Sequence, residues 1–189
     1  MAAATVLTVL GLALVGNGLA IHAKAVLAQF LLDRAFAKSL ETGQPIKAWS
    51  WADTWPVARL EVPRLGVSAI VLDGGSGEAL AFGPGHVAGT PDPGEAGASV
   101  IAAHRDTQFA FLRDIRIGDK IRVTRRDRVT LWFRITGTAV VPWDASGIDP
   151  NQEGYWLVLS TCWPLNAVRS GNLRYIVRAV LIGREFSAR

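Results

Sequence analysis

The chain has 189 residues, of which 50% are hydrophobic, and it carries a formal net charge of +4 with a sequence pI near 9.7. After an apolar N-terminal segment is set aside, about 145 residues remain, a length that suits one domain with a real hydrophobic core. The single cysteine excludes an intramolecular disulfide and a cysteine-based zinc site, and the acidic residues that interrupt the basic stretch 113–134 indicate a solvated mixed-charge surface rather than a nucleic-acid-binding one.

The first predicted element is an apolar N-terminal helix. Residues 2–21 contain no charged side chain, and the first charged side chain is that of Lys24. Twenty helical residues rise about 30 Å, the thickness of a bilayer's hydrocarbon core, so residues 1–23 are predicted to be a transmembrane anchor. A signal segment cleaved near Ala23-Lys24-Ala25 is the alternative, and both alternatives export the rest of the chain. A buried core helix fits less well, because this segment has no polar face for water.

Residues 24–56 are predicted to form a lead-in helix and a tryptophan-rich linker. A helix over 22–42, continuing from the anchor, is favoured by apolar residues near a 3.6-residue period: Val26, Leu27, Phe30, Leu31 and Ala35. Gly43 and Pro45 are expected to end it. The segment 47–56 carries three tryptophans, which could lie at the headgroup level of a membrane or could cap the domain.

From Val57 onward the pattern is that of an all-β domain, predicted to span 57–189. Short runs rich in valine, isoleucine, leucine and aromatic residues alternate with turn residues. The predicted strands lie within 57–62, 67–75, 98–104, 109–124 (after a short helical turn), 128–142 (one strand or two joined at Gly137), 154–162 and 173–183. The segment 80–97 is dense in glycine and proline and is expected to be a loop with one helical turn. Roughly seven or eight strands with short connections favour closure into a barrel, which removes exposed sheet edges.

Two of the predicted strands end in reactive side chains. His104 follows the apolar run 98–103, and Cys162 ends the run that begins at residue 154. A group at the end of a strand is held rigidly while its tip is exposed, which catalysis requires of a scaffold. If the strands of Cys162 and Arg174 are antiparallel neighbours, these two side chains meet at the same end of the sheet.

A cysteine, a histidine and an arginine gathered at one edge would supply a nucleophile, a proton carrier and a fixed cation. The thiolate attacks a carbonyl, the imidazole protonates the leaving amine, and the guanidinium donates hydrogen bonds to the substrate or to the oxyanion. The combination predicts acyl transfer through a thioester. Taken singly, a lone cysteine can also be an inert core residue. Of the other two histidines, His86 is expected to shape the loop that contains it, and His22 to be an interface residue.

These residues resemble the motifs of the sortases, membrane-anchored cysteine transpeptidases with an eight-stranded β-barrel. Residues 158–162, VLSTC, are similar to the family's Thr-Leu-x-Thr-Cys motif, and residues 103–107, AHRDT, are similar to its Gly-His-Arg-Asp-Thr segment. Arg174 follows the cysteine at the family's usual spacing. The first position of each motif differs, with valine for threonine and alanine for glycine, and neither performs chemistry. The resemblance covers roughly 57–183.

The resemblance implies His104, Cys162 and Arg174 as catalytic residues and Thr161 and Ser160 as substrate-binding residues. It implies as substrate another exported protein, with a C-terminal sorting signal similar to Leu-Pro-x-Thr-Gly, which is cut between threonine and glycine and transferred to an amine of unknown identity. The sequence has no acidic cluster like that of calcium-stimulated members, so no metal and no other cofactor is expected.

The subclass and the compartment follow from the same resemblance. The Cys-Trp-Pro sequence at 162–164 and the short anchor are most similar to the sortase type of proteobacteria (class GN). That type implies a single-pass protein of the inner membrane, held by its N-terminal helix, with the catalytic domain in the periplasm. Among the nearby arginines, spacing favours Arg174 over Arg169 and Arg178 as the catalytic cation.

Two other functions stay open from the residues. The first is a cysteine transpeptidase that acts on peptidoglycan stems. Such enzymes usually carry a His-Gly-Cys motif with an arginine soon after it, and residues 162–164 do not match this motif. The second is an anchored β-barrel without catalysis that binds a partner, with Cys162 in a structural role.

Overall fold

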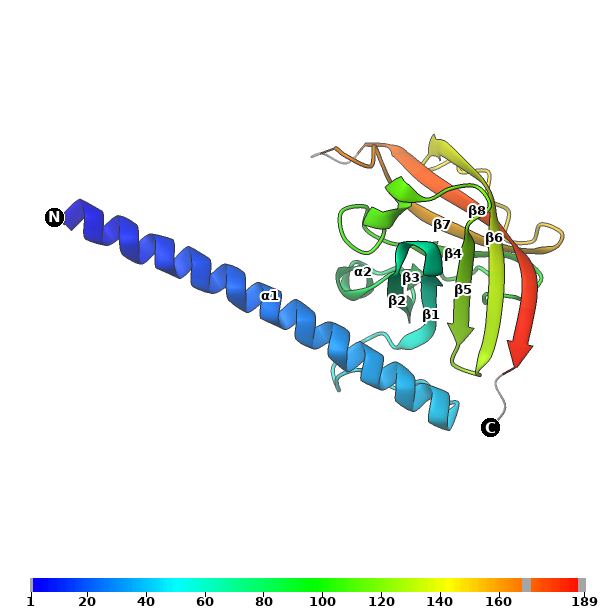
Figure 1. Ribbon diagram of the computed structural model, residues 1–189, viewed down its shortest axis with the longest axis horizontal. Coiled ribbons are helices and arrows are strands. Elements are labelled where there is room, and N and C mark those ends of the chain that lie inside the picture. The colour runs from blue at the N-terminus through cyan, green and yellow to red at the C-terminus, as the bar shows by residue number, and fades with distance from the viewer. Residues whose placement is uncertain (1, 168–170, 187–189) are drawn as a thin grey trace.

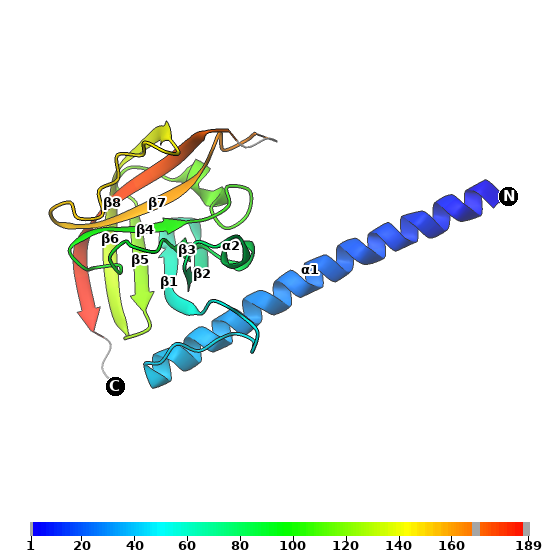
Figure 2. The ribbon, with the colours of Figure 1, turned by 180° about the vertical axis from the view of Figure 1, so that it is seen from behind.

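A closed β-barrel makes up most of the molecule, and a long helix, α1 (Ala2–Thr42), precedes it (Figures 1 and 2). The computed structural model describes residues 2–167 and 171–186, and at residues 2–9, 12–22 and 78 it describes the backbone alone. Over these residues the chain forms eight strands, whose order around the barrel is β1-β2-β3-β4-β7-β8-β6-β5. The predicted eight-stranded barrel is confirmed.

Short connections join most of these strands. The strands are β1 (Pro56–Val62), β2 (Val67–Asp73), β3 (Gly85–His86), β4 (Gly97–Ala102), β5 (Lys120–Arg125), β6 (Val129–Pro142), β7 (Tyr155–Trp163) and β8 (Leu173–Phe186). The short helices between them are η1 (Pro63–Leu65), α2 (Gly77–Phe82) and η2 (Ala110–Asp114). Each predicted strand segment therefore contains one strand.

Alternate side chains of the strands fill the barrel interior. In β1, buried and half-buried positions alternate along the whole strand, and Ala58, Leu60 and Val62 face the core. This pattern arises because successive side chains of a strand point to opposite faces of the sheet. Phe109 and Phe133 are among the largest fully buried side chains. Since the interior is a packed core, reactive groups have to lie on the outer face or at a rim.

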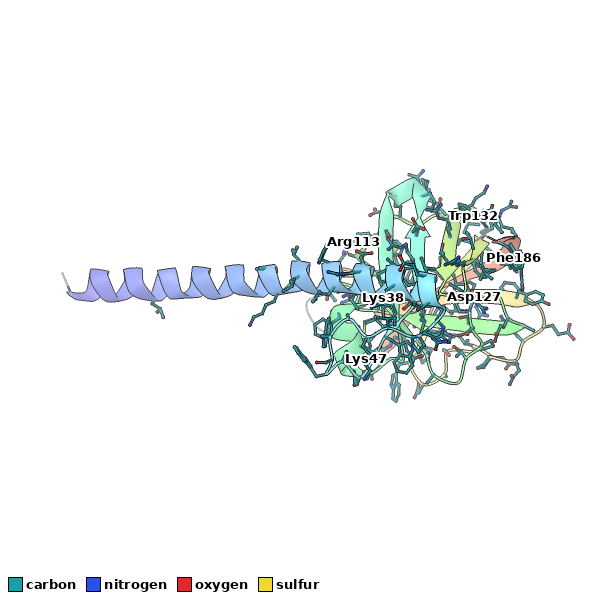
Figure 3. The ribbon with its side chains drawn as sticks, turned by 90° about the horizontal axis from the view of Figure 1, so that it is seen from below. Lys38, Lys47, Arg113, Asp127, Trp132 and Phe186 are labelled. Atoms are coloured by element: carbon teal, nitrogen blue, oxygen red, sulfur yellow. The ribbon has the colours of Figure 1, made fainter. Side chains whose placement is uncertain are left out.

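The C-terminal part of α1 packs against the barrel. Leu32 and Phe36 are buried in one cluster with Ile70 and Leu72 of β2. The helix ends before Gly43, whose φ of 68° lies in the left-handed region that favours glycine. The predicted continuation of one helix from the anchor into the lead-in segment is confirmed, and its N-terminal part projects away from the barrel (Figures 1 and 3).

An anchor is predicted for residues 1–23, but most side chains of this segment lie outside the part of the chain that the structure describes. The side chain of His22, for which an interface role is expected, lies outside it as well. Within the part of the chain that the structure describes, no helix has both the length and the apolar character needed to cross a membrane. The anchor and the cleaved-signal alternative stay predictions.

The tryptophan-rich linker caps the barrel with one of its rings. Trp49 packs edge-on against Phe82 of α2, with ring centroids 4.8 Å apart. Trp51, in contrast, is 80% exposed. Of the two alternatives for this segment, capping of the domain therefore holds for Trp49, while Trp51 lies on the surface.

The segment 80–97 is more structured than its composition indicates. It contains β3, which pairs in parallel with β2 and antiparallel with β4, and it begins inside α2. A Cβ at Gly85 would lie 2.1 Å from the carbonyl oxygen of Gly74, so the backbones approach too closely for any other residue. β4 ends earlier than predicted, at Ala102 and before His104. Of the two alternatives for 128–142, one long strand is confirmed, since β6 is a single strand with a register shift near Gly137.

An ion pair fixes the turn that leads into β5. Nε and Nη2 of Arg64 donate to the carboxylate of Asp119 at 2.5 and 2.7 Å, and the backbone N–H of Arg116 donates to it at 2.8 Å. The hydrogen bond from Arg64 holds the pKa of the buried Asp119 carboxyl below its usual value, although burial acts in the opposite direction. The turn predicted at Gly118-Asp119 is thereby joined to η1.

We expect Asp119→Asn to lower the free energy of unfolding at neutral pH by about 2 kcal/mol, because a neutral amide cannot accept both hydrogen bonds from Arg64. Since the folded-state pKa of Asp119 is lowered, its contribution to stability is present above the unfolded-state pKa and is lost as pH falls through the folded-state pKa. Urea denaturation at a series of decreasing pH values should therefore show the wild type and the variant converging.

Asp144→Asn is the matched control, because Asp144 is an exposed carboxylate in the β6–β7 connection. This variant should change the unfolding free energy by less than about 0.5 kcal/mol. An equal loss in both variants, or a loss in Asp119→Asn that does not depend on pH, would contradict the stabilising role of the ion pair.

Candidate functional site

Three neighbouring strands meet at one rim of the barrel. β4 pairs in parallel with β7, where Ala102 lies opposite Ser160. β7 pairs antiparallel with β8, where Cys162 lies directly opposite Arg174. The C-terminal ends of β4 and β7 and the start of β8 therefore share one edge. The register confirms that Cys162 and Arg174 lie on antiparallel neighbouring strands at the same end of the sheet.

Cys162 and Arg174 belong to the outer face of this sheet. Leu159 faces the barrel core, whereas Val158 lies in a separate hydrophobic cluster with Ile176 of β8, which we call the outer cluster. Because side chains alternate along a strand, Cys162 falls on the face of Val158, and Arg174 falls on the face of Ile176. The thiol of Cys162 is free and half-buried. It is therefore accessible from outside the barrel rather than locked in the core.

His104 lies at the same rim, although β4 ends before it. The backbone N–H of Ala103 donates to the carbonyl of Ser160 at 3.2 Å, so the β4–β7 pairing continues past the last strand residue. His104 follows Ala102 by two residues, as Cys162 follows Ser160 by two, so both residues lie just past the last paired position of β4 with β7. Val100 of β4 belongs to the outer cluster, so the alternation places His104 on the outer face as well. The imidazole is exposed there.

The guanidinium of Arg174 lies beside the β7–β8 connection. Its Nη1 donates to the carbonyl oxygens of Leu173 at 3.0 Å and Gly171 at 3.4 Å. The side chain is half-buried, so the cation stays partly open to solvent at the edge that carries Cys162.

Arg178, one of the two arginines that spacing disfavoured, does not lie at this position. Arg178 lies opposite Val158, further along the sheet from the rim, and its Nη2 donates to the carbonyl of Gly147 at 3.2 Å. Arg169 lies outside the described residues. The register therefore favours Arg174 as the cation next to the thiol.

The two residues expected to contact substrate, Thr161 and Ser160, lie on opposite faces of β7. Thr161 is only 3% exposed, and its hydroxyl donates to the carbonyl of Ala103 at 2.7 Å. This burial favours a role in orienting the residue before His104 over direct contact with a substrate. Ser160 is half-buried on the face of Cys162. The substrate contacts of both residues stay predictions.

Sequence reasoning missed Arg105, which is buried beside the candidate residues. Only 5% of it is exposed, yet it is charged. Nη1 donates to the carbonyl of Pro164 at 2.9 Å and Nη2 to that of Ala167 at 2.5 Å. No periodicity signals such a residue, because its partners are backbone carbonyls about sixty positions away in the chain. An arginine directly after a candidate histidine was the available clue.

His86 holds the loop on one side of the outer cluster. Its Nε2 lies 2.9 Å from the carbonyl oxygen of Pro91 and 3.2 Å from the hydroxyl of Thr90. The same hydroxyl accepts a hydrogen bond from the backbone N–H of Val100 in β4 at 3.2 Å. His86 is 7% exposed. Its expected role in shaping this loop is confirmed.

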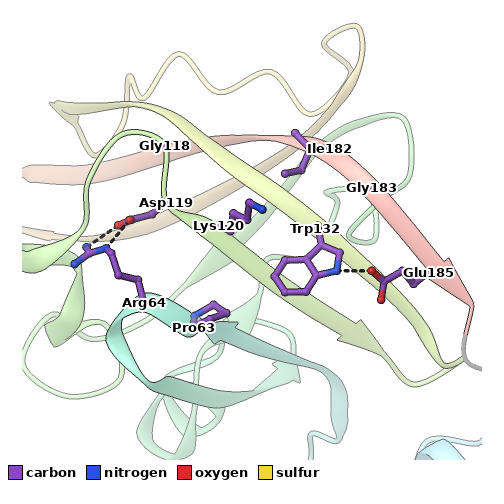
Figure 4. A pocket seen from close by; sticks show the side chains of 9 residues that line it. All are labelled: Pro63, Arg64, Gly118, Asp119, Lys120, Trp132, Ile182, Gly183 and Glu185. Carbon is purple, nitrogen blue, oxygen red and sulfur yellow. Dashed lines mark hydrogen bonds and ion pairs between the residues drawn. The ribbon is translucent and has the colours of Figure 1, made fainter.

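A cavity of about 700 Å³ lies elsewhere, on the outer side of β5, β6 and β8 (Figure 4). Arg64 and Asp119 form their ion pair at its edge, and Nε1 of Trp132 donates to Glu185 at 3.0 Å. Arg64 is paired with Asp119 and Trp132 with Glu185, and the residues that line the cavity include no cysteine, serine or histidine. Among the side chains that the structure describes, no group of three or more histidine, cysteine, aspartate or glutamate residues could hold a metal ion. The rim that carries Cys162 therefore remains the candidate site.

The arrangement at the rim has the groups that acyl transfer requires. A thiol can form a covalent acyl intermediate, an imidazole at the same rim can carry a proton, and a fixed guanidinium can donate hydrogen bonds to a developing oxyanion. Cys162 and Arg174 lie on paired strands, and His104 follows the end of β4 by two residues, so the scaffold limits their relative motion.

Comparisons with known proteins agree with this chemistry. The family model of the sortase domain matches residues 60–182. Sortase D of Bacillus subtilis (strain 168) is 30% identical over 119 residues, which are 62% of this chain and 60% of that protein, so the match spans less than two thirds of the relative.

Solved structures extend the comparison. The structure of sortase E from Streptomyces avermitilis is 33% identical, with a TM-score of 0.59 over 69% of this chain and 90% of that one. A Clostridium perfringens sortase D5 transpeptidase is 23% identical, with a TM-score of 0.63 over 82% of this chain and 96% of that one, a level of identity that supports the fold alone.

The start of β4 depends on a glycine that also holds the β6–β7 connection. The N–H of Gly97 donates to the carbonyl of Gly154 at 2.8 Å, and the N–H of Ala98 donates to that of Pro150 at 3.0 Å. Gly97 has a φ of 110°, and a Cβ there would lie 2.1 Å from the carbonyl oxygen of Pro150. Only glycine fits this position without moving backbone.

We expect Gly97→Ala to lower the free energy of unfolding by about 3 kcal/mol, because it combines a strained backbone with a clash against a carbonyl. Urea denaturation followed by circular dichroism measures this loss. Gly77→Ala is the control, since a Cβ at Gly77 meets nothing within 4 Å. It should leave stability unchanged or raise it by up to about 1 kcal/mol. Similar stability in both variants would disprove the requirement for glycine at the start of β4.

Proposed function

Because the chain belongs to the sortase family, we propose that it is a cysteine transpeptidase that cuts a C-terminal sorting signal and transfers the upstream protein to an amine. The observation that supports the proposal is the strand register, which sets Cys162 opposite Arg174 and brings the end of β4, two residues before His104, to the same rim. All three residues lie within the range that the family model matches. The family match and the absence of a His-Gly-Cys motif at residues 162–164 disfavour a peptidoglycan-directed transpeptidase, and a non-catalytic barrel would give the three functional groups no role.

The first half of the reaction forms a thioester. The thiolate of Cys162 attacks the carbonyl carbon of the threonine in a signal similar to Leu-Pro-x-Thr-Gly. Arg174 donates hydrogen bonds to the substrate or to the oxyanion of the tetrahedral intermediate. When the intermediate collapses, the bond to the glycine nitrogen breaks, and His104 gives its proton to the leaving amine. The products are an acyl-enzyme on sulfur and the released glycine end.

The second half transfers the acyl group. An amine attacks the thioester carbonyl, and His104, now neutral, takes the proton that the amine loses. The carbon–sulfur bond breaks, and the thiolate of Cys162 is restored. The same imidazole thus acts first as an acid and then as a base, which requires it to stay close to the sulfur throughout.

The N-terminal helix would hold this chemistry at a membrane. The charge-free residues 2–21 are followed in α1 by Val26, Leu27 and Phe30, whose exposed fractions of 55–61% leave apolar surface uncovered. Such surface, continuous with an apolar helix, suits the interface of a bilayer. The substrate is then another exported protein on the extracytoplasmic side. The Cys-Trp-Pro sequence supports the proteobacterial (class GN) type and a periplasmic domain.

We expect Cys162→Ala to abolish thioester formation with a sorting-signal peptide, because the variant lacks the nucleophile. His104→Ala should slow peptide cleavage about a thousand-fold and Arg174→Ala about a hundred-fold, the scales of a lost general acid and a lost oxyanion donor. Intact-mass analysis after incubation with peptide and a test amine detects the adduct, and product formation gives the rates.

Arg178→Ala is the matched control on the same strand face. Its guanidinium donates to the carbonyl of Gly147, away from the thiol, so the cleavage rate of the variant should stay within about three-fold of that of the wild type. Thermal unfolding verifies that each variant is folded. The proposed mechanism would be wrong if a folded Cys162→Ala protein still cleaved the peptide. It would also be wrong if Arg178→Ala lowered the cleavage rate as much as Arg174→Ala does.

A further inference from the structure

Arg105 is a charged side chain in a buried position at the rim of the candidate site. It is 5% exposed, and burying a guanidinium is costly unless its donors are satisfied. Its Nε lies 3.4 Å from the carboxylate of Asp106, which is itself 67% exposed. The shorter hydrogen bonds go instead to backbone carbonyls, those of Pro164 and Ala167. The charge is therefore satisfied mainly by one loop of the protein rather than by an acid.

That loop is the connection that follows the nucleophile. Pro164 comes two residues after Cys162 and Ala167 five residues after it, while Arg105 comes directly after His104. One planar guanidinium thus joins the segment of the histidine to the segment of the cysteine through two separate hydrogen bonds. A bidentate arrangement of this kind fixes orientation as well as distance.

The ladder between β4 and β7 does not reach this far. Its last contacts are the N–H of Ala103 on Ser160 and the hydroxyl of Thr161 on the carbonyl of Ala103, both before the histidine. C-terminal to the histidine, the N–H of Phe109, a residue buried in the core, donates to the carbonyl of His104. The histidine segment is therefore tied to the core by Phe109, and beyond Ala103 its described link to the cysteine segment runs through Arg105.

We propose that Arg105 is a positioning residue, which sets the separation between the imidazole of His104 and the sulfur of Cys162 by holding the two connections together. This role rests on the proposed function, because a fixed separation matters only if the two groups exchange a proton through the substrate. An error of about 1 Å in such an arrangement can cost about a hundred-fold in rate. Substrate affinity depends on other contacts and changes little.

The test uses the reactivity of the thiol, which needs no substrate. Because Cys162 is the single cysteine, alkylation of the full chain in detergent micelles by iodoacetamide reports on this sulfur alone. The pH dependence of the alkylation rate is measured for the wild type, His104→Ala, Arg105→Met and Arg105→Lys. An imidazole held near the sulfur alters this pH dependence, and His104→Ala removes that effect.

We expect the alkylation rate of Arg105→Met to depend on pH in the same way as that of His104→Ala. Arg105→Lys keeps the charge but can reach one carbonyl at a time, so its profile should lie between the wild type and Arg105→Met, and it keeps the test decisive if the methionine variant fails to fold. With a cleavable peptide, kcat should fall about ten- to a hundred-fold while KM stays within about three-fold.

Arg128→Met is the control for a purely structural arginine. Nε of Arg128 donates to the carbonyl of Leu40 at 2.6 Å, at the end of α1 and outside the candidate site. This variant should lower the melting temperature yet keep the wild-type alkylation profile. If the folded Arg105 variants also keep the wild-type alkylation profile, the positioning role is wrong, while the proposed function is unaffected. If His104→Ala itself leaves the profile unchanged, the imidazole is not held near the sulfur and the positioning role fails, whereas the proposed function is decided separately by cleavage of the sorting-signal peptide.

Discussion

The parallel pairing of β4 with β7 is the constraint on which the rest of the site depends. Most neighbouring strands of this barrel run antiparallel, and an antiparallel β4 would carry His104 to the rim opposite Cys162. The observed register, from Gly97 opposite Tyr155 to Ala102 opposite Ser160, sends both strand ends to one edge. Because β8 runs antiparallel to β7, it begins where β7 ends, and its second residue, Arg174, lies opposite Cys162.

Past the end of β4, hydrogen bonds from side chains replace the ladder. The hydroxyl of Thr161 reaches the carbonyl of Ala103 from inside the barrel, and Arg105 reaches across to the β7–β8 connection. Both are buried polar groups whose donors are satisfied, which is the condition for such groups to rigidify a structure rather than destabilise it. His104 lies past the end of β4, where strand pairing no longer fixes it, so its position relative to Cys162 depends on such links.

The fold separates the groups that stabilise it from the groups at the rim. Alternation along each strand directs the large apolar side chains inward, and the same alternation leaves Cys162, Arg174 and His104 on the outer face. Helix α1 joins the domain through Leu32 and Phe36 against β2, and its C-terminal end lies at the other end of the barrel from the β7–β8 connection (Figure 1). Substitutions at the rim can therefore change chemistry with modest effects on the core.

The sequence by itself determined the strand pattern, the barrel class and the meeting of Cys162 with Arg174, because each depends on local periodicity or on a short connection between adjacent strands. Tertiary structure alone decided the parallel pairing of β4 with β7, the short strand β3 and the buried contacts of Arg105. These features join segments that are distant in the chain, and some use backbone carbonyls, which every residue has and no sequence pattern marks.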